Sequence, residues 1–180
     1  AVDCSLEQMD QADLVVVPTI GGKIETVLAE ERDALPWLRF LHQGGADLAS
    51  NCTGAFLLAE AGLLDDKTAT THWGFSQAFR HRYPQANLNE RELITRDGNI
   101  FCAGGGTAWR DLTILLVERF CGADLARELA RAFVIDVRND LQSIYAGLPA
   151  HTYHQDDQVQ AIQGWIHEHY KENTSLGQLA

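Results

Sequence analysis

Hydrophobic positions in the first part of the chain predict a strand, a helix and a second strand. Residues 13–18 form a short β-branched run that a proline ends, which is typical of a central strand buried on both faces. Leu35, Leu38 and Leu41 share one helical face, and a pair of glycines follows them. Because the next apolar run begins at Ala46, we expect a β-α-β unit.

The alternation of strands and helices continues downstream. Residues 46–50 predict a second strand, which leads through Asn51-Cys52-Thr53-Gly54 into an apolar helix. The pattern then predicts a strand, a hairpin around Asp97-Gly98 and two helices, at residues 67–71, 93–103, 106–120 and 123–133. We therefore predict an α/β fold with a doubly wound, mostly parallel sheet flanked by helices, and one antiparallel hairpin.

The pattern changes after residue 138. Residues 139–155 are rich in turn-forming and polar residues, as a linker is. Beyond them, Val159, Ile162 and Ile166 mark the apolar face of a helix, and a second helix begins one turn before the last residue. A helix of one turn is not stable alone in water, so we expect residues 156–180 to be the truncated start of a second domain.

Composition and charge exclude several classes of protein. The 180 residues are 46% hydrophobic and 22% charged, which suits one α/β core with a short additional segment. No apolar run is long enough to span a bilayer, and no basic segment precedes one at the start, so we expect a cytoplasmic protein. The formal net charge of -11 would repel phosphate backbones, so this segment alone should not bind nucleic acid.

Cys52 is the strongest candidate for a site residue. A sharp strand-to-helix turn needs small neighbours, and Ser50 and Gly54 stand two positions before and after it, as in nucleophile elbows. Such a turn lies at the carboxyl edge of a parallel sheet, where α/β proteins bind ligands. The helix that follows would favour a thiolate. A buried, inert cysteine is the alternative, and we favour a Cys52 that faces a ligand.

Residues from two other segments are predicted to meet Cys52. His72 ends the next predicted strand and would emerge at the same edge if that strand is parallel to the first. Gly21 and Gly22 follow the first strand and could present backbone N–H groups to the same point. Asp111 is the best candidate for the carboxylate of a Cys-His pair, although it also fits as a favourable charge in a helix's first turns.

The remaining motifs predict no cofactor and no metal. Gly104-Gly105-Gly106 lacks the spacing of a dinucleotide loop and the lysine of a P-loop. The four cysteines lie far apart without metal-ligand spacing, so we expect neither a zinc site nor a disulfide scaffold. Two short histidine pairs near the end of the chain have no third ligand at a suitable spacing.

Together the motifs resemble the core signature of the ThiJ/PfpI superfamily, the glutamine-amidotransferase-like domains. The resemblance covers approximately residues 13–138, and it is carried by NCTGAFLLAEAGLL at 51–64, ATTHW at 69–73 and AGGGTA at 103–108. Within that superfamily, the form of these motifs is most similar to the sensor half of AraC-type transcriptional regulators. Trp165-Ile166 and Ser175-Leu176 in the tail resemble the opening of an AraC-type DNA-binding domain.

The resemblance implies a flavodoxin-like sensor domain over residues 1–138, a linker over 139–155 and the start of an all-α helix-turn-helix domain over 156–180. It implies a homodimer that responds to a small-molecule effector, with small nitrogen-containing compounds as first candidates, and that binds DNA through the missing C-terminal domain. It also implies that the opening β-α-β segment of such domains is absent, and with it the acid of the enzymatic members. The expected ligand-binding residues are Ile20, Gly21, Gly22, Cys52, Thr53, His72 and Trp73.

Two other functions fit the same residues. Isocyanide hydratases of the superfamily share the Cys-Thr-Gly elbow and the Thr-Thr-His-Trp segment, and a cysteine-dependent hydrolase or lyase of that type would use Cys52 and His72 in catalysis. A ThiJ-like protein that senses oxidants through Cys52 is the third possibility. The predicted tail helix favours the regulator, because the enzymes end near the last helix that covers the sheet.

Overall fold

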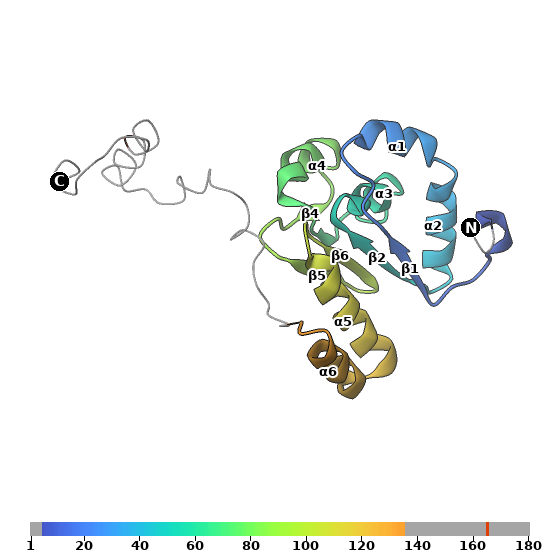
Figure 1. Cartoon of the computed structure of the whole chain (residues 1–180). Coiled ribbons are helices and arrows are strands. Elements are labelled where there is room, and N and C mark those ends of the chain that lie inside the picture. The colour runs from blue at the N-terminus through green and yellow to red at the C-terminus, as the bar shows by residue number, and fades with distance from the viewer. Residues whose placement is uncertain (1–4, 136–164, 166–180) are drawn as a thin grey trace. The chain divides into compact units, whose positions relative to one another are not determined.

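The computed structural model describes residues 5–135 and Trp165 (Figure 1). The chain divides into two units, Ala1–Ser143 and Ile144–Ala180, and the sheets and their covering helices belong to the first. The predicted linker over residues 139–155 and, apart from Trp165, the predicted tail helices lie outside the described residues. The domain organisation therefore stays a prediction.

The first unit is built on a four-stranded sheet of order β1-β2-β6-β5 (Figure 1). Its strands are β1 (Leu14–Val17), β2 (Asp47–Asn51), β5 (Ile94–Asp97) and β6 (Ile100–Ala103). β1, β2 and β6 run parallel, whereas β5 pairs antiparallel with β6. Gly98, in the turn between them, has a φ of 61°, which glycine adopts without strain. The predicted mostly parallel sheet with one antiparallel hairpin is confirmed.

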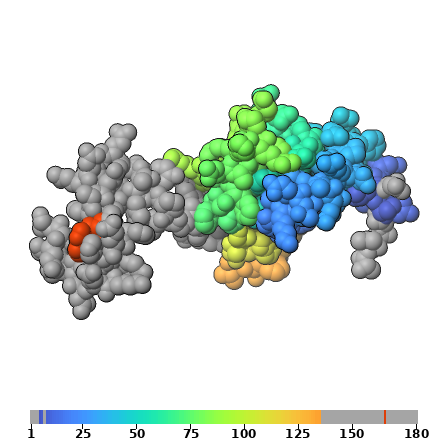
Figure 2. Space-filling view, turned by 90° about the horizontal axis from the view of Figure 1, so that it is seen from above, coloured from blue at the N-terminus to red at the C-terminus, as the bar shows by residue number. Residues whose placement is uncertain are grey.

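Helices cover both sides of this sheet, as a doubly wound fold requires (Figure 1). On one side lie α1 (Ile24–Glu30), α2 (Ala34–Gln43), α3 (Ala55–Glu60) and α4 (Ser76–Arg82). α1 and α4 lie side by side on the surface of that side (Figure 1, Figure 2). On the other side lies α5 (Ala108–Cys121), with α6 (Ala123–Ala132) packed against it.

A separate hydrophobic core lies on each side because successive side chains of a strand point to opposite faces. Leu48 of β2 belongs to the core beneath α1–α4, together with Phe56 and Phe79, whose ring centroids are 4.9 Å apart. The next residue, Ala49, belongs to the core beneath α5, together with Phe101. β2 is therefore a central strand that is buried on both faces.

β1 differs from its prediction as a central strand buried on both faces. In the described part of the chain it pairs only with β2 and forms an edge of the sheet. Val17, which faces α1–α4, is 6% exposed, whereas Val16, which faces the α5 side, is 52% exposed. The cause is that α5 packs mainly on β6 and β5; on β1, Leu14 is partly buried against this core, whereas Val16 faces the open groove between β1 and α5.

The strand predicted over residues 67–71 is shorter and lies outside the main sheet. β3 (Thr68–Ala69) pairs in parallel with β4 (Asn87–Leu88) in a separate two-stranded sheet. β3 is therefore not hydrogen-bonded to the strands of the main sheet, so strand pairing does not place His72 beside Cys52. The contacts described below bring His72 to the same edge by another route.

The remaining predicted helices are confirmed as α2, α3, α5 and α6, with ends shifted by a few residues. Two helices of seven residues, α1 and α4, had no counterpart among the predicted elements, because each is too short to show a clear helical period. No helix in the described residues combines the length and the apolar character that crossing a membrane requires.

Candidate functional site

A sharp turn joins β2 to α3 and presents Cys52. β2 ends at Asn51, a single 3₁₀ turn follows, and α3 begins at Ala55. Cys52 has a φ of 56°, a left-handed conformation that costs a non-glycine residue about 1–2 kcal/mol. Such strain persists only where the surrounding structure imposes it, and it is common at functional sites. The predicted strand, turn and helix around Cys52 are confirmed.

Gly54 explains why this elbow needs a small residue two positions after Cys52. A Cβ at Gly54 would lie 2.5 Å from the carbonyl oxygen of Pro18 and 2.6 Å from that of Val17. Both oxygens belong to the backbone at the end of β1, so they cannot turn aside as a side chain would. The elbow therefore packs directly on the segment that follows β1.

Thr53 holds the loop after β1 against the elbow. Its Oγ1 accepts a hydrogen bond of 3.1 Å from the backbone N–H of Ile20 and lies 3.0 Å from the hydroxyl oxygen of Thr19. Thr53 is buried, so these bonds also satisfy a hydroxyl that has left water. Gly21 follows with a φ of 79°. The structure thus brings Ile20, the first of the three predicted loop residues, to Thr53.

His72 is fixed by bonds on both sides of it in the chain. The Thr71 hydroxyl donates a 2.8 Å hydrogen bond to the backbone oxygen of Cys52, which anchors this segment to the elbow. His72 Nδ1 accepts a 3.0 Å hydrogen bond from Gly74 N–H. The His72 and Trp73 rings stack with centroids 5.1 Å apart. Burial lowers the pKa of His72 and so favours the neutral ring.

The glycine loop after β6 lies beside the elbow. Asn51 pairs in register with Ala103, so the residues that follow these two parallel strands, among them Cys52, meet at one edge of the sheet. The His72 ring lies against Gly105, where an added Cβ would be 1.9 Å from Cδ2. Sequence reasoning considered this loop as a nucleotide site and as part of the family signature, but it missed the contact with His72, because nothing local to either segment signals it.

The edge therefore offers a strained thiol, a neutral imidazole and an aromatic ring, supplied by different segments. Asp111 lies in the first turn of α5, where the helix dipole favours a carboxylate. Among the residues that the structure describes, no three His, Cys, Asp or Glu side chains gather as a metal site would need. The chemistry available is hydrogen bonding and stacking with an organic ligand, with Cys52 as the potential nucleophile.

Two other cysteines have different surroundings from Cys52. Cys102 is fully buried in β6, and burial raises the pKa of its thiol, which keeps it protonated and unreactive. Cys121 is exposed at the end of α5. Cys52, which is partly buried at the carboxyl edge, combines access with a defined position.

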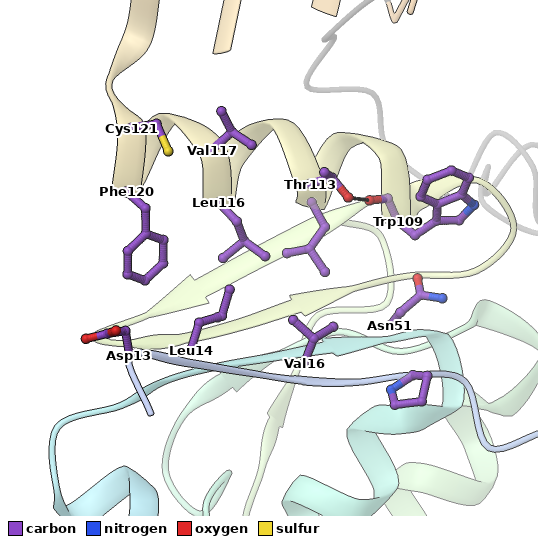
Figure 3. Close-up of a pocket in the computed structure, with 12 residues that line it drawn as sticks. Asp13, Leu14, Val16, Asn51, Trp109, Thr113, Leu116, Val117, Phe120 and Cys121 are labelled. Atoms are coloured by element: carbon purple, nitrogen blue, oxygen red, sulfur yellow. Dashed lines mark hydrogen bonds between the residues drawn. The ribbon is translucent and has the colours of Figure 1, made fainter. Parts of the chain in front are cut away.

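An apolar groove between β1 and α5 is a second candidate binding surface (Figure 3). It has a volume of about 560 Å³, with Asn51 and Trp109 at one end and Phe120 and Cys121 at the other. Asn51 Oδ1 is buried and has no hydrogen-bond partner in the described part of the chain. An apolar cleft with few polar groups is typical of small-molecule sites. Sequence reasoning missed this groove because it assigned Val16 to a covered strand.

Comparison with curated proteins finds both regulators and an enzyme. The sequence pattern of the DJ-1/PfpI family matches residues 1–119. The HTH-type transcriptional regulator CdhR of Pseudomonas aeruginosa is 38% identical over 133 residues, which are 74% of this chain and 38% of CdhR. The isonitrile hydratase of Pseudomonas putida is 33% identical over 124 residues, which are 68% of this chain and 52% of that enzyme.

A solved structure agrees with the fold. The AraC family transcriptional regulator from Pseudomonas putida matches with a TM-score of 0.54 at 23% identity, over 74% of this chain and 69% of that chain. The likeness supports the arrangement of strands and helices and nothing finer. The chain spans about half or less of the length of the two curated relatives.

Proposed function

The chain belongs to the DJ-1/PfpI family, and we propose that it is the ligand-sensing part of an AraC-type transcriptional regulator. The 38% identity to the regulator CdhR supports this proposal. DNA binding would reside in a C-terminal helix-turn-helix domain that residues 156–180 begin, and the sensing domains would form a homodimer. The effector would be a small metabolite.

The observation that carries the proposal is the hydrogen bonding of three separate segments at one edge of the sheet. The Ile20 backbone donates to Thr53, and the Thr71 hydroxyl donates to the backbone of Cys52. A ligand at this edge would contact all three segments and could favour one arrangement of them, which is what a sensor needs. Its proposed contacts are Ile20, Gly21, Gly22, Cys52, Thr53, His72 and Trp73.

A cysteine-dependent hydrolase or lyase is the second candidate. The left-handed φ of Cys52 and the 33% identity to isonitrile hydratase favour it. Nucleophilic catalysis would need a base to accept the thiol proton. His72 Nδ1 already accepts a hydrogen bond from Gly74, so a neutral ring carries its own proton on Nε2 and is poorly placed as that base. We therefore place Cys52 in the wall of a binding site.

Calorimetry on the full-length protein with a panel of nitrogen-containing metabolites tests the sensor proposal. We expect one compound to bind and to change the affinity for DNA fragments that the full-length protein selects, with DNA binding that falls steeply as salt rises. Cys52→Ala should weaken ligand binding by only a few fold. Cys121→Ala is the control for a thiol outside the Cys52 edge: it lies at the end of the apolar groove opposite Asn51, so ligand binding lost in this variant alone would instead point to the groove.

The same variants test the enzyme. The enzyme proposal predicts steady-state turnover of an isonitrile or another small substrate by the wild type and by Cys121→Ala, and loss of turnover in Cys52→Ala. That result would contradict the sensor proposal and favour a hydrolase or lyase. Ligand binding without turnover, retained in Cys52→Ala, supports the sensor.

A further inference from the structure

Gly105 leaves room for the His72 ring. A Cβ at this position would lie 1.9 Å from Cδ2, 2.7 Å from Cγ and 2.7 Å from Nε2 of His72. No side chain can share that space, so any residue other than glycine would displace the ring. Gly106, the next residue, has open space around its Cα, so the requirement belongs to Gly105 alone within the pair.

The ring is held in one orientation as well as in one place. Gly74 N–H donates to Nδ1 at 3.0 Å, and the Trp73 ring stacks on the imidazole with an interplanar angle of 30°. Phe75 meets the ring edge-on, with centroids 5.8 Å apart. Because Nδ1 accepts, the proton of a neutral imidazole must sit on Nε2. His72 is thus a hydrogen-bond donor with a fixed direction.

The donor nitrogen lies at the edge where the ligand site is proposed. Nε2 is one of the three ring atoms nearest to Gly105, in the loop beside the Cys52 elbow. The hydrogen bond between Gly74 and His72 uses Nδ1, so Nε2 remains available to a ligand. A polar N–H whose direction the protein fixes is a recognition group for a ligand acceptor.

We propose that Gly105 is a positioning residue that seats His72 as an Nε2–H donor, and that the site selects metabolites presenting a carbonyl or carboxylate oxygen to that nitrogen. This inference rests on the proposed function, because it assumes that a metabolite binds at the Cys52 edge. The glycine loop thereby has a role in ligand recognition, although it lacks the spacing of a nucleotide-binding loop.

Nitrogen-15 NMR of the His72 ring in the 180-residue chain tests the tautomer directly. We expect the wild type to show the Nε2–H form at neutral pH. Gly105→Ala should lose that single form, because the ring is pushed off Gly74 and Trp73. Gly106→Ala is the control: its φ of 62° strains an alanine, but its open surroundings leave His72 in place.

Small probes test the acceptor preference. Acetate and N,N-dimethylacetamide offer oxygen acceptors, whereas methylammonium offers only donors. We expect the first two to shift the His72 resonances in the wild type and methylammonium to leave them unchanged. Measured on the Trp73 indole resonance, which every variant retains, Gly105→Ala and His72→Asn should each weaken probe binding about tenfold, and the double variant should lose no more than either single one.

Three results would overturn the inference: a proton on Nδ1 in the wild type, an unchanged His72 form in Gly105→Ala, or a response to methylammonium equal to that of acetate. These outcomes are distinct from failure of the proposed function. If no metabolite alters DNA binding by the full-length protein but the tautomer and probe results hold, the regulator is wrong while the donor site stands.

Discussion

The two faces of strand β1 are covered to different extents. Val17 of β1 points into the core beneath α1–α4 and is 6% exposed, whereas Val16 points to the α5 side and is 52% exposed. The two residues have the same side chain and adjacent positions, so only what covers each face differs. On the closed side, the core beneath α1–α4 covers all the parallel strands. On the open side, the core beneath α5 covers β2 and β6 but only part of β1, where Leu14 is packed and Val16 faces a groove.

The candidate site depends on the closed side. The elbow after β2 packs on the end of β1 through Gly54, and its helix α3 is buried in that core. The apolar groove belongs to the open side and lacks such packing (Figure 3). We therefore compare substitutions on the two sides of the sheet. Those at residues that support the site should destabilise the fold more than those at residues that only line the groove.

The largest contrast is expected between two aromatic residues. Phe56→Ala removes a ring that is 1% exposed and packed against Phe79, and it should lower the free energy of unfolding by about 3–5 kcal/mol. Trp109→Ala removes a ring that is 52% exposed beside the groove, and it should cost less than about 1 kcal/mol. Urea unfolding of the 180-residue chain measures both. Equal losses would mean that the groove is covered in solution.

The next contrast concerns the close packing at the elbow. Gly54→Ala puts a Cβ within 2.6 Å of two backbone oxygens and should cost about 3 kcal/mol, because neither can move without distorting β1. Gly22→Ala is the matched control, since its Cβ would come no nearer than 4.0 Å, to Phe75. Thermal unfolding compares the two. A Gly54→Ala protein as stable as the control would show that the elbow does not press on β1.

The paired valines give a smaller effect and test the comparison most directly. Val17→Ala removes two buried carbons and should cost about 2 kcal/mol, whereas Val16→Ala should cost about 0.5 kcal/mol or less. The urea midpoints of the two variants should therefore differ clearly with similar slopes. If Val16→Ala were as costly as Val17→Ala, the prediction of a strand buried on both faces would hold in solution after all.

Local signals predicted much of this fold. The β-branched run ending at Val17, the helical spacing of α2 and the turn at Gly98 each depend on residues close in sequence, and the structure has all three elements. The elbow was located in the same way, from the small residues on either side of Cys52. Short-range patterns fix the conformation of a segment, which is why these predictions were confirmed.

The long-range neighbours of each segment could not be predicted from short-range patterns. An apolar run indicates that a strand suits burial, but whether Val16 is buried depends on where α5 lies. Likewise, β3 joins β4 through a pairing with residues almost twenty positions away. His72 and Gly105 are even farther apart in the sequence. Sequence reasoning therefore predicted His72 as a site residue but not Gly105, whose missing side chain leaves space for its ring.

The smallest expected effect is the pH dependence that His72 contributes. Burial lowers the pKa of His72 from its ordinary value of 6.5, so the unfolded chain binds its proton at a higher pH than the folded protein does. The stabilisation is therefore present above about pH 6.5 and is lost as the pH falls toward the folded pKa. Arg82 lowers the pKa of Glu60, whose contribution is lost only below about pH 4.5 and so falls outside this window.

His72→Asn isolates this contribution, because its amide oxygen can still accept from Gly74 but does not titrate. Urea midpoints of the wild type should fall between about pH 7 and pH 5, and those of the variant should fall less. Identical pH profiles would mean that the folded protein protonates His72 as readily as the unfolded chain. The imidazole would then be solvated rather than packed against Gly105. The close packing beneath α1–α4 would not extend to the candidate site.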